Sequence, residues 1–324
     1  MRIGFTTDAE VELLDWAKQH GFGSIEWMRF DQSFAAPGQE RWREDAERFG
    51  AEAKARDVRI SAIGAYYRNP LDPAQIESAR AVLHRAIDVA ALLGIKTVAG
   101  FPGAVIQTTL NSRGGNPVYQ PLENFLPQIL AFWEPIAQYA ADHGVRLAFE
   151  HCPQGAFHLP VMHYNIFGQP AMWERFFSAT KCANIGLEWD AAHLMCQFID
   201  PVDNLRKFGA KVFHVHAKDA FIHRELLATY GLCHPGVAEH RLPGFGQANW
   251  SEIIHALLRA GYDSDLNIEG WHDPVFRDHT PDSSHPLAGQ KLEREGWLRG
   301  KQYLEMFVPR EDWRKSPKRG SLAS

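Results

Sequence analysis

Short apolar segments with the composition of β-strands alternate with longer segments of helical periodicity as far as about residue 306. The strand-like segments are residues 3–6, 24–28, 60–64, 97–101, 146–150, 185–189, 212–217 and 266–269. Eight parallel strands with helices between them are typical of the closed (β/α)8 barrel. Since no Pro-, Gly- or Ser-rich linker interrupts the repeat, we predict a single α/β (β/α)8 TIM barrel over residues 1–308 and a polar C-terminal tail over residues 309–324.

Helical periodicity is clearest in two segments that end at glycine. Apolar residues recur on one helical face before Gly94 and again before Gly261. Glycine adopts the left-handed conformation that ends a helix without steric cost, and a predicted strand follows each of these positions. The same junction between helix, glycine and strand recurs at Gly21, Gly144 and Gly209.

The other ends of the strands carry the long connections. Residues 102–121, 151–169 and 218–249 follow the fourth, fifth and seventh predicted strands. Loops of this length are usually functional or disordered, and a TIM barrel carries its active site in its βα loops at the C-terminal face. An open doubly wound sheet is the main alternative, but neither a GxGxxG nor a GxxxxGK[ST] motif follows a strand.

Charge and composition exclude several classes of partner. The chain has 34 Lys and Arg residues against 39 Asp and Glu residues, a formal charge of −5, and its basic residues form a block only near the C-terminus. This pattern disfavours a nucleic-acid partner. The sequence has neither a signal-like N-terminus nor a membrane-spanning apolar run, and its four cysteines lack metal or disulfide spacing. We therefore expect a cytoplasmic protein with free thiols and no membrane contact.

The last four predicted strands each end in, or beside, an ionisable side chain. These side chains are Glu150, Asp190, His216 and Glu269. A barrel directs the C-terminal ends of its strands to one mouth, and three carboxylates with one imidazole suit Mn²⁺, Mg²⁺ or Co²⁺, and Zn²⁺ less specifically. Four unrelated surface residues are the alternative, but the repetition on consecutive strands favours one shared divalent metal ion.

The sequences around these residues resemble one protein family. LAFE ending at Glu150, GLEWDAAH at 186–193, HVHAKD at 214–219, RLPGFGQANW at 241–250 and GYDSDLNIEG at 261–270 are similar to the xylose-isomerase-like TIM barrels, often labelled sugar phosphate isomerase/epimerase. The resemblance extends over about residues 1–306. It implies the same four metal ligands, and it implies that Glu150 and Glu269 are also the paired catalytic acid and base.

Five further residues are candidates for substrate binding: His193, Lys218, Arg241, Trp27 and Trp271. The resemblance places His193 near substrate. Lys218 either contacts substrate or pairs with Asp219, and Arg241 either binds an anion or sugar hydroxyls or clamps its loop to Asp219 or Glu239. The two tryptophans could stack on the apolar face of a sugar, although aromatic residues at a barrel rim are more often packed. Glu26 could also reach the mouth from the second strand.

These residues predict an enzyme, a metal-dependent sugar isomerase or epimerase. Its substrate would be a ketose or related polyol, converted through a metal-bound enediolate. A lyase of the inosose dehydratase or keto-glycoside β-eliminase type is the first alternative.

Two remote alternatives belong to other classes. A nuclease of the endonuclease IV type needs extra histidines on the third and fourth strands, which are missing here, and a non-catalytic sugar-binding barrel would be expected to lose one of the paired glutamates. We also expect a homo-oligomer, a dimer or tetramer, with Phe132 and Trp133 as weak candidates for its buried helix packing.

Overall fold

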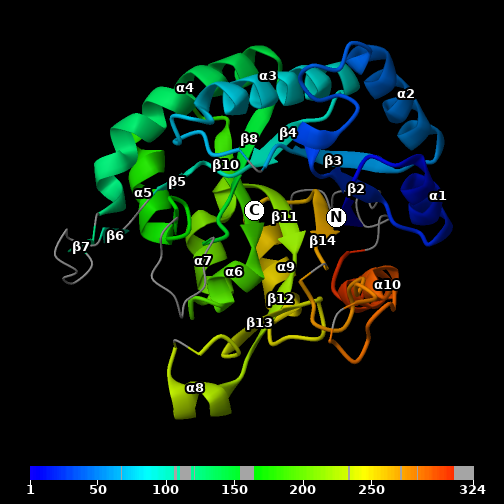
Figure 1. Cartoon of the computed structure of the whole chain (residues 1–324), viewed down its shortest axis with the longest axis vertical. Helices are drawn as coiled ribbons and strands as arrows, with labels where there is room; N and C mark the ends of the chain where they lie inside the picture. Colours follow the sequence, from blue (N-terminus) through cyan, green and yellow to red (C-terminus); the bar gives the residue numbers. More distant parts are fainter. Residues whose placement is uncertain are drawn as a thin grey trace, which may run out of the picture.

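The computed structural model describes residues 1–66, 68–105, 108–109, 118–119, 121–153, 164–232, 234–270, 272–282 and 284–309. Eight parallel strands close into a barrel in the order β1-β14-β11-β10-β8-β4-β3-β2 (Figure 1). In chain order they are β1 (Arg2–Thr7), β2 (Ser24–Trp27), β3 (Arg59–Gly64), β4 (Thr97–Gly100), β8 (Arg146–Glu150), β10 (Ile185–Asp190), β11 (Val212–Ala217) and β14 (Asp265–Ile268). Each predicted strand lies within one residue of an observed one, and the predicted TIM barrel is confirmed.

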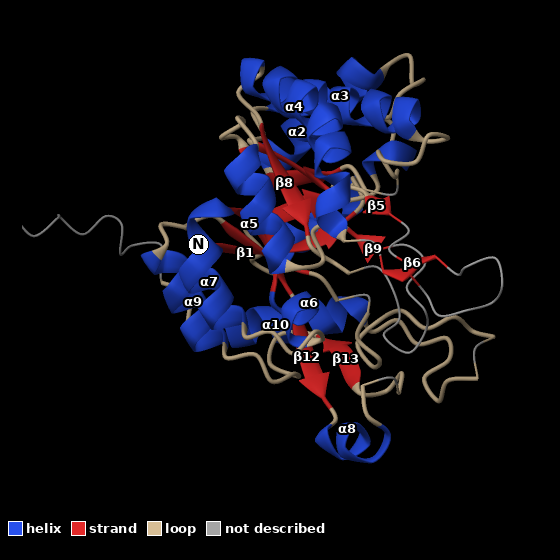
Figure 2. Cartoon of the chain, turned by 90° about the vertical axis from the view of Figure 1, so that its left-hand side faces the viewer, coloured by secondary structure: helices blue, strands red, loops and turns tan. Residues whose placement is uncertain are grey.

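Helices surround the barrel, as the side view shows (Figure 2). They are α1 (Val11–Gln19), α2 (Trp42–Ala55), α3 (Ile76–Leu93), α4 (Leu126–Asp142), α5 (Pro170–Ala179), α6 (Ala191–Met195), α7 (Pro201–Phe208), α9 (Trp250–Arg259) and α10 (Glu293–Leu304). Short 3₁₀ helices occupy Phe30–Gln32, Leu122–Phe125 and Gly209–Lys211. Of the three antiparallel strand pairs that the described residues form outside the barrel, two are very short: β5 (Ala104–Val105) with β9 (Tyr164–Asn165), and β6 (Thr108–Thr109) with β7 (Val118–Tyr119).

The predicted glycine junctions form in two ways. Gly94 and Gly261 have φ values of 71° and 87°, the left-handed conformation expected where α3 and α9 end. Gly209 differs, because its φ of −55° is an ordinary right-handed value. A Cβ at Gly209 would lie 2.5 Å from the Cβ of Ala260, so this position requires glycine for close packing rather than for its backbone conformation.

The segment predicted as a loop at 218–249 contains two strands and a helix. They are β12 (Asp219–Ile222), α8 (Arg224–Tyr230) and β13 (Ala238–Arg241), and the two strands pair antiparallel. Figures 1 and 2 show this hairpin and α8 projecting from the barrel. Much of the other two predicted loops, at 102–121 and 151–169, lies outside the described residues, as do residues 310–324 of the predicted tail.

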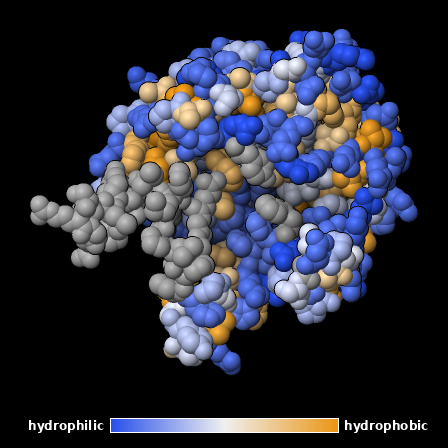
Figure 3. Space-filling model, viewed as in Figure 1, coloured by the Kyte–Doolittle hydropathy of each residue, from blue (hydrophilic) through white to orange (hydrophobic). Residues whose placement is uncertain are grey.

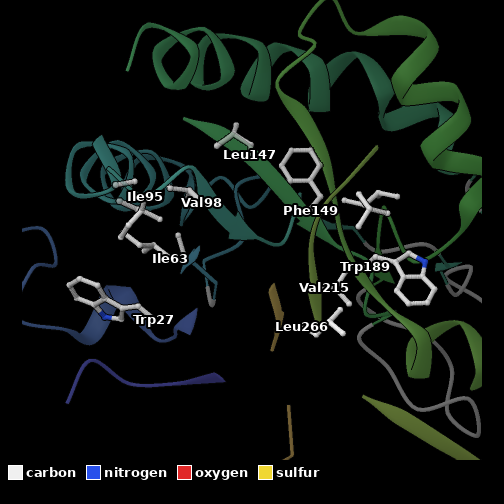
Figure 4. Close-up of a cluster of buried hydrophobic side chains, with 14 of the residues drawn as sticks. Trp27, Ile63, Ile95, Val98, Leu147, Phe149, Trp189, Val215 and Leu266 are labelled. Atoms are coloured by element: carbon white, nitrogen blue, oxygen red, sulfur yellow. The ribbon is translucent and has the colours of Figure 1, made fainter. Parts of the chain in front are cut away.

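The hydrophobic core fills the space between strands and helices (Figure 4). Trp27 belongs to this core: its side chain is fully buried, and its ring lies 5.0–5.4 Å from those of Phe30, Phe34 and Phe49. Phe132 and Trp133 are buried in the core as well. These two residues therefore present no exposed surface for self-association. The homo-oligomer itself stays a prediction.

Replacing Trp27 by alanine should lower the free energy of unfolding by about 3–5 kcal/mol, because it empties a large buried volume. Denaturant unfolding followed by circular dichroism measures this change. Tyr230→Ala on α8 is the matched control, since Tyr230 is 62% exposed and its removal should change stability by less than about 0.5 kcal/mol. A loss below about 1 kcal/mol for Trp27→Ala would contradict the core assignment.

Among the described residues, no helix combines the length and the apolar character needed to cross a membrane.

Candidate metal centre at the barrel mouth

The four predicted metal ligands come together at one end of the barrel. Each of Glu150, Asp190, His216 and Glu269 offers a ligand atom within 4.8 Å of the others, and all four are buried. We call this set the ligand cluster. Three of its members lie on the neighbouring strands β8, β10 and β11, and Glu269 directly follows β14, so that Glu150 and Glu269 belong to the outer two of these four strands. Figure 3 shows this face of the molecule hollowed near its centre over largely hydrophilic residues.

Asp190 is fixed because it ends β10 and begins α6. Its Oδ1 caps the helix by accepting the backbone N–H groups of Ala192 (2.7 Å) and His193 (3.4 Å). The backbone N–H of Asp190 donates to Nε2 of His151 at 2.9 Å. His151 directly follows the neighbouring strand β8. These bonds leave Oδ2 facing the ligand cluster, and burial raises the pKa of the carboxyl to about 6 despite the opposing charge of Lys218.

His216 faces in two directions from β11. Its Nε2 lies 2.7 Å from Glu26 Oε2, inside the barrel, and its Nδ1 lies 3.0 Å from Glu269 Oε2, in the ligand cluster. Within the described residues, Nδ1 is buried without a hydrogen-bond partner. One ring nitrogen is therefore satisfied, and the other is directed toward the three carboxylates.

Lys218 occupies the same site. Its fully buried ammonium lies 2.7 Å from Glu269 Oε2, 3.0 Å from Asp190 Oδ2 and 3.1 Å from His193 Nε2. Burial alone would lower the pKa of Lys218, but the two carboxylates hold it well above its ordinary value. In turn, Lys218 and His216 outweigh the effect of burial on Glu269 and hold its pKa well below the usual range.

The ligand cluster fits a divalent cation. Three carboxylates and one imidazole are a hard, mainly oxygen donor set. Asp190 Oδ2 and His216 Nδ1 are both buried among charged groups, with Lys218 Nζ 3.0 Å from Asp190 Oδ2 and Glu269 Oε2 3.0 Å from His216 Nδ1. An ion there would share the oxygens that the Lys218 ammonium now contacts.

His193, which was predicted to lie near substrate, lies beside the ligand cluster. Its Nε2 is 3.1 Å from Glu150 Oε1, and burial, followed by the charge of Lys218, holds its pKa well below the ordinary value. Three imidazole rings form a row that begins at His193. The ring centroids of His193 and His240 are 5.2 Å apart, and those of His240 and His272 are 5.3 Å apart. His240 comes from the hairpin and His272 from the segment after β14. Neither His240 nor His272 is among the residues that the sequence predicted for substrate or metal binding.

Lys218, Asp219 and Arg241 differ from their predicted pairings. Lys218 contacts the ligand cluster, whereas Asp219 accepts backbone N–H groups, including those of Ala220 and Ala248 at 2.8 Å. Arg241 Nε lies 3.1 Å from Asp273 Oδ2 rather than pairing with Asp219 or Glu239. Its guanidinium thus ties the hairpin to the segment that follows β14.

The two tryptophans proposed for stacking are not part of the described site. Trp27 is directed into the core, because neighbouring residues of a strand face opposite sides and Glu26 faces the barrel interior. Trp271 lies outside the described residues. Of the four predicted substrate-binding residues that the structure describes, His193 and Lys218 contact the ligand cluster, whereas Trp27 and Arg241 make other contacts.

Comparison with known proteins identifies the family. The family model described as xylose isomerase-like TIM barrel matches residues 14–301. A curated relative, the uncharacterized protein YfiH of Bacillus subtilis (strain 168), is 25% identical over 250 residues, which cover 70% of this chain and 75% of that protein. The chain therefore belongs to the xylose isomerase-like TIM barrel family, as the sequence motifs predicted.

Two solved structures share the fold at low sequence identity. The IOLI protein, crystallised with a zinc atom, is 15% identical, with a TM-score of 0.67 and coverage of 96% of this chain and 100% of that one. D-psicose 3-epimerase from Clostridium cellulolyticum H10, crystallised with D-tagatose, is 13% identical, with a TM-score of 0.65 and the same coverage.

Proposed function

We propose that this protein is a divalent-metal-dependent sugar epimerase or isomerase. The observation that carries the proposal is the placement of two glutamates, Glu150 and Glu269, at the two ends of one buried ligand cluster. D-psicose 3-epimerase, which shares the fold, supports a sugar as the substrate. The zinc atom in the IOLI protein supports a metal ion as the cofactor. The donor set favours Mn²⁺, Mg²⁺ or Co²⁺, with Zn²⁺ as the next candidate.

The ion, when bound, would polarise the carbonyl group of a ketose and make the neighbouring C–H bond acidic. The carboxylate of one glutamate then accepts the proton, while the electron pair of the C–H bond moves toward the carbonyl oxygen. The other glutamate, in its protonated form, returns a proton. Delivery to the opposite face of the same carbon gives an epimer. Delivery to the former carbonyl carbon, together with transfer of the hydroxyl proton of the first carbon to the former carbonyl oxygen, gives an aldose–ketose isomerisation.

The remaining polar groups bind and orient the substrate. The Lys218 ammonium is a hydrogen-bond donor placed between Asp190 and Glu269. The neutral imidazole of His193 lies beside Glu150. We propose that both contact substrate oxygens. Burial of the cluster keeps bulk water from competing for the acidic C–H position.

The proposal is tested by deuterium transfer. A proton that passes through a glutamate carboxyl exchanges with solvent, so turnover in deuterated water should label one substrate carbon. A product of unchanged formula supports an epimerase or isomerase, whereas a product that lacks water or an aglycone would replace that assignment by a lyase.

A further inference from the structure

Glu26 lies inside the barrel, although β2 is not one of the strands that carry the ligand cluster. Its side chain is fully buried, and its Oε2 reaches to 2.7 Å from Nε2 of His216. Since β2 is flanked by β1 and β3 and not by β11, this contact crosses the barrel interior. We propose that Glu26 is a positioning residue, which fixes His216 so that its Nδ1 faces the ligand cluster, where it would bind a metal ion.

The direction of the hydrogen bond determines which nitrogen is available. An ionised carboxylate only accepts hydrogen bonds, so the bond to Glu26 requires the proton of His216 to lie on Nε2. In the neutral ring the lone pair is then on Nδ1, which is 3.0 Å from Glu269 Oε2 and 3.7 Å from Glu150 Oε1. A carboxylate behind a histidine ligand also orients the ring and makes the ligating nitrogen more basic. The inference rests on the proposed function for the role of His216 as a ligand.

Glu26 is itself held by a buried network. Its Oε1 accepts a hydrogen bond from the Tyr66 hydroxyl at 3.1 Å, and that hydroxyl also contacts Glu188. Glu188 Oε1 lies 2.7 Å from Nδ1 of His214, whose Nε2 lies 3.1 Å from Ser61 Oγ. These side chains are buried and come from four different strands or strand ends, so they restrict the position of the Glu26 carboxylate.

A second metal site is the competing interpretation of these residues. Glu26, Glu188, His214 and His216 also offer ligand atoms within 4.8 Å of one another. However, their polar atoms pair within the network, as Glu26 does with His216 and Glu188 with His214. Of the ring and carboxylate atoms of these four residues, only His216 Nδ1 is buried without a hydrogen-bond partner among the described residues, and it faces the ligand cluster. The geometry therefore favours a support for one metal ion.

Zinc titration of the whole protein tests the inference. Calorimetry should give a Zn²⁺ dissociation constant about 10- to 100-fold higher for Glu26→Leu than for the wild type, as expected when the partner of a ligating histidine is lost. Glu26→Gln should retain most of the affinity, because its amide oxygen accepts the same N–H. The control is Ser24→Ala on the same strand. It removes a buried hydroxyl group that donates to Asn267 rather than to His216, so it should leave the zinc affinity unchanged.

A second readout reports the position of the proton directly. Long-range ¹H–¹⁵N NMR of zinc-loaded protein with labelled histidine should show a protonated Nε2 and a ligated Nδ1 on His216. A folded Glu26→Leu variant with wild-type zinc affinity would overturn the inference, as would the opposite nitrogen assignment or two zinc ions per chain. If Glu26→Leu does not fold, Glu26→Gln alone decides the outcome. A loss of zinc affinity of about 10- to 100-fold in Glu26→Gln would then overturn the inference.

These outcomes separate the inference from the proposed function. A wild-type protein that ligates zinc through Nδ1 but converts no sugar would remove the proposed function and leave the role of Glu26 intact. A wild-type protein that epimerises a sugar, with a Glu26→Leu variant of unchanged zinc affinity, would remove the role of Glu26 alone.

Discussion

Replacing Glu269 by glutamine should reduce turnover by about 10²- to 10⁴-fold, the range that one general acid or base contributes. The amide preserves the shape of the side chain and still offers an oxygen to the ion, but it cannot carry the proton. Because Glu269 is also expected to bind the metal, metal content must be measured beside the rate. We expect the variant to remain folded and to retain its ion while it loses turnover.

The control for this variant is Glu293→Gln on α10, a half-buried glutamate outside the ligand cluster. Its turnover should stay within a few-fold of the wild type. Sustained turnover by a metal-replete Glu269→Gln protein would remove Glu269 from the acid/base role and leave only a role as ligand. Thermal unfolding of each variant shows whether the lost contact with Lys218 has altered the fold.

Replacing His216 by alanine should abolish stoichiometric metal binding, whereas His214→Ala should only weaken it. Both histidines are buried on β11 and face the barrel interior, but only His216 belongs to the ligand cluster. We expect the metal affinity to fall by more than about 100-fold for His216→Ala, since the loss of a ligand should exceed the 10- to 100-fold effect of losing a residue behind it.

Elemental analysis and metal titration measure this difference. The wild type should hold one divalent ion per chain, which a chelator removes and added metal restores. His214→Ala is the matched control because it removes the same side chain from the same strand. Equal losses in the two variants would mean that the ion does not distinguish the two histidines, and the assignment of His216 alone as ligand would be wrong.

The sequence predicted the barrel and the ligand cluster because both depend on local patterns. Each strand is a short apolar segment, and each of the four cluster residues lies at or near the end of its own strand. Closure of the barrel then brings those ends together. Asp190 illustrates the point, since one residue ends a strand, caps the following helix and faces the mouth.

Contacts across the barrel and between distant segments were harder to predict. The contact of Glu26 with His216 joins residues 190 positions apart, and it depends on which side chains of β2 face the interior. Trp27, its neighbour, faces the core for the same reason. Arg241 pairs with Asp273 because the ordered hairpin lies against the segment after β14, and neither the hairpin nor that packing has a signal in local residue spacing.

The central claim is that Glu150 and Glu269 move a proton at a carbon next to a carbonyl group, and solvent labelling tests it most directly. Metal-loaded wild-type protein is incubated in deuterated water with ketoses, inososes and 3-keto-glycosides, and the sugars are examined by NMR and mass spectrometry. Chelator-treated protein is the control and should give no label. We expect one deuterium at a single carbon of a product with unchanged formula. Metal-replete protein that exchanges no C–H proton on any of these substrates would contradict the account.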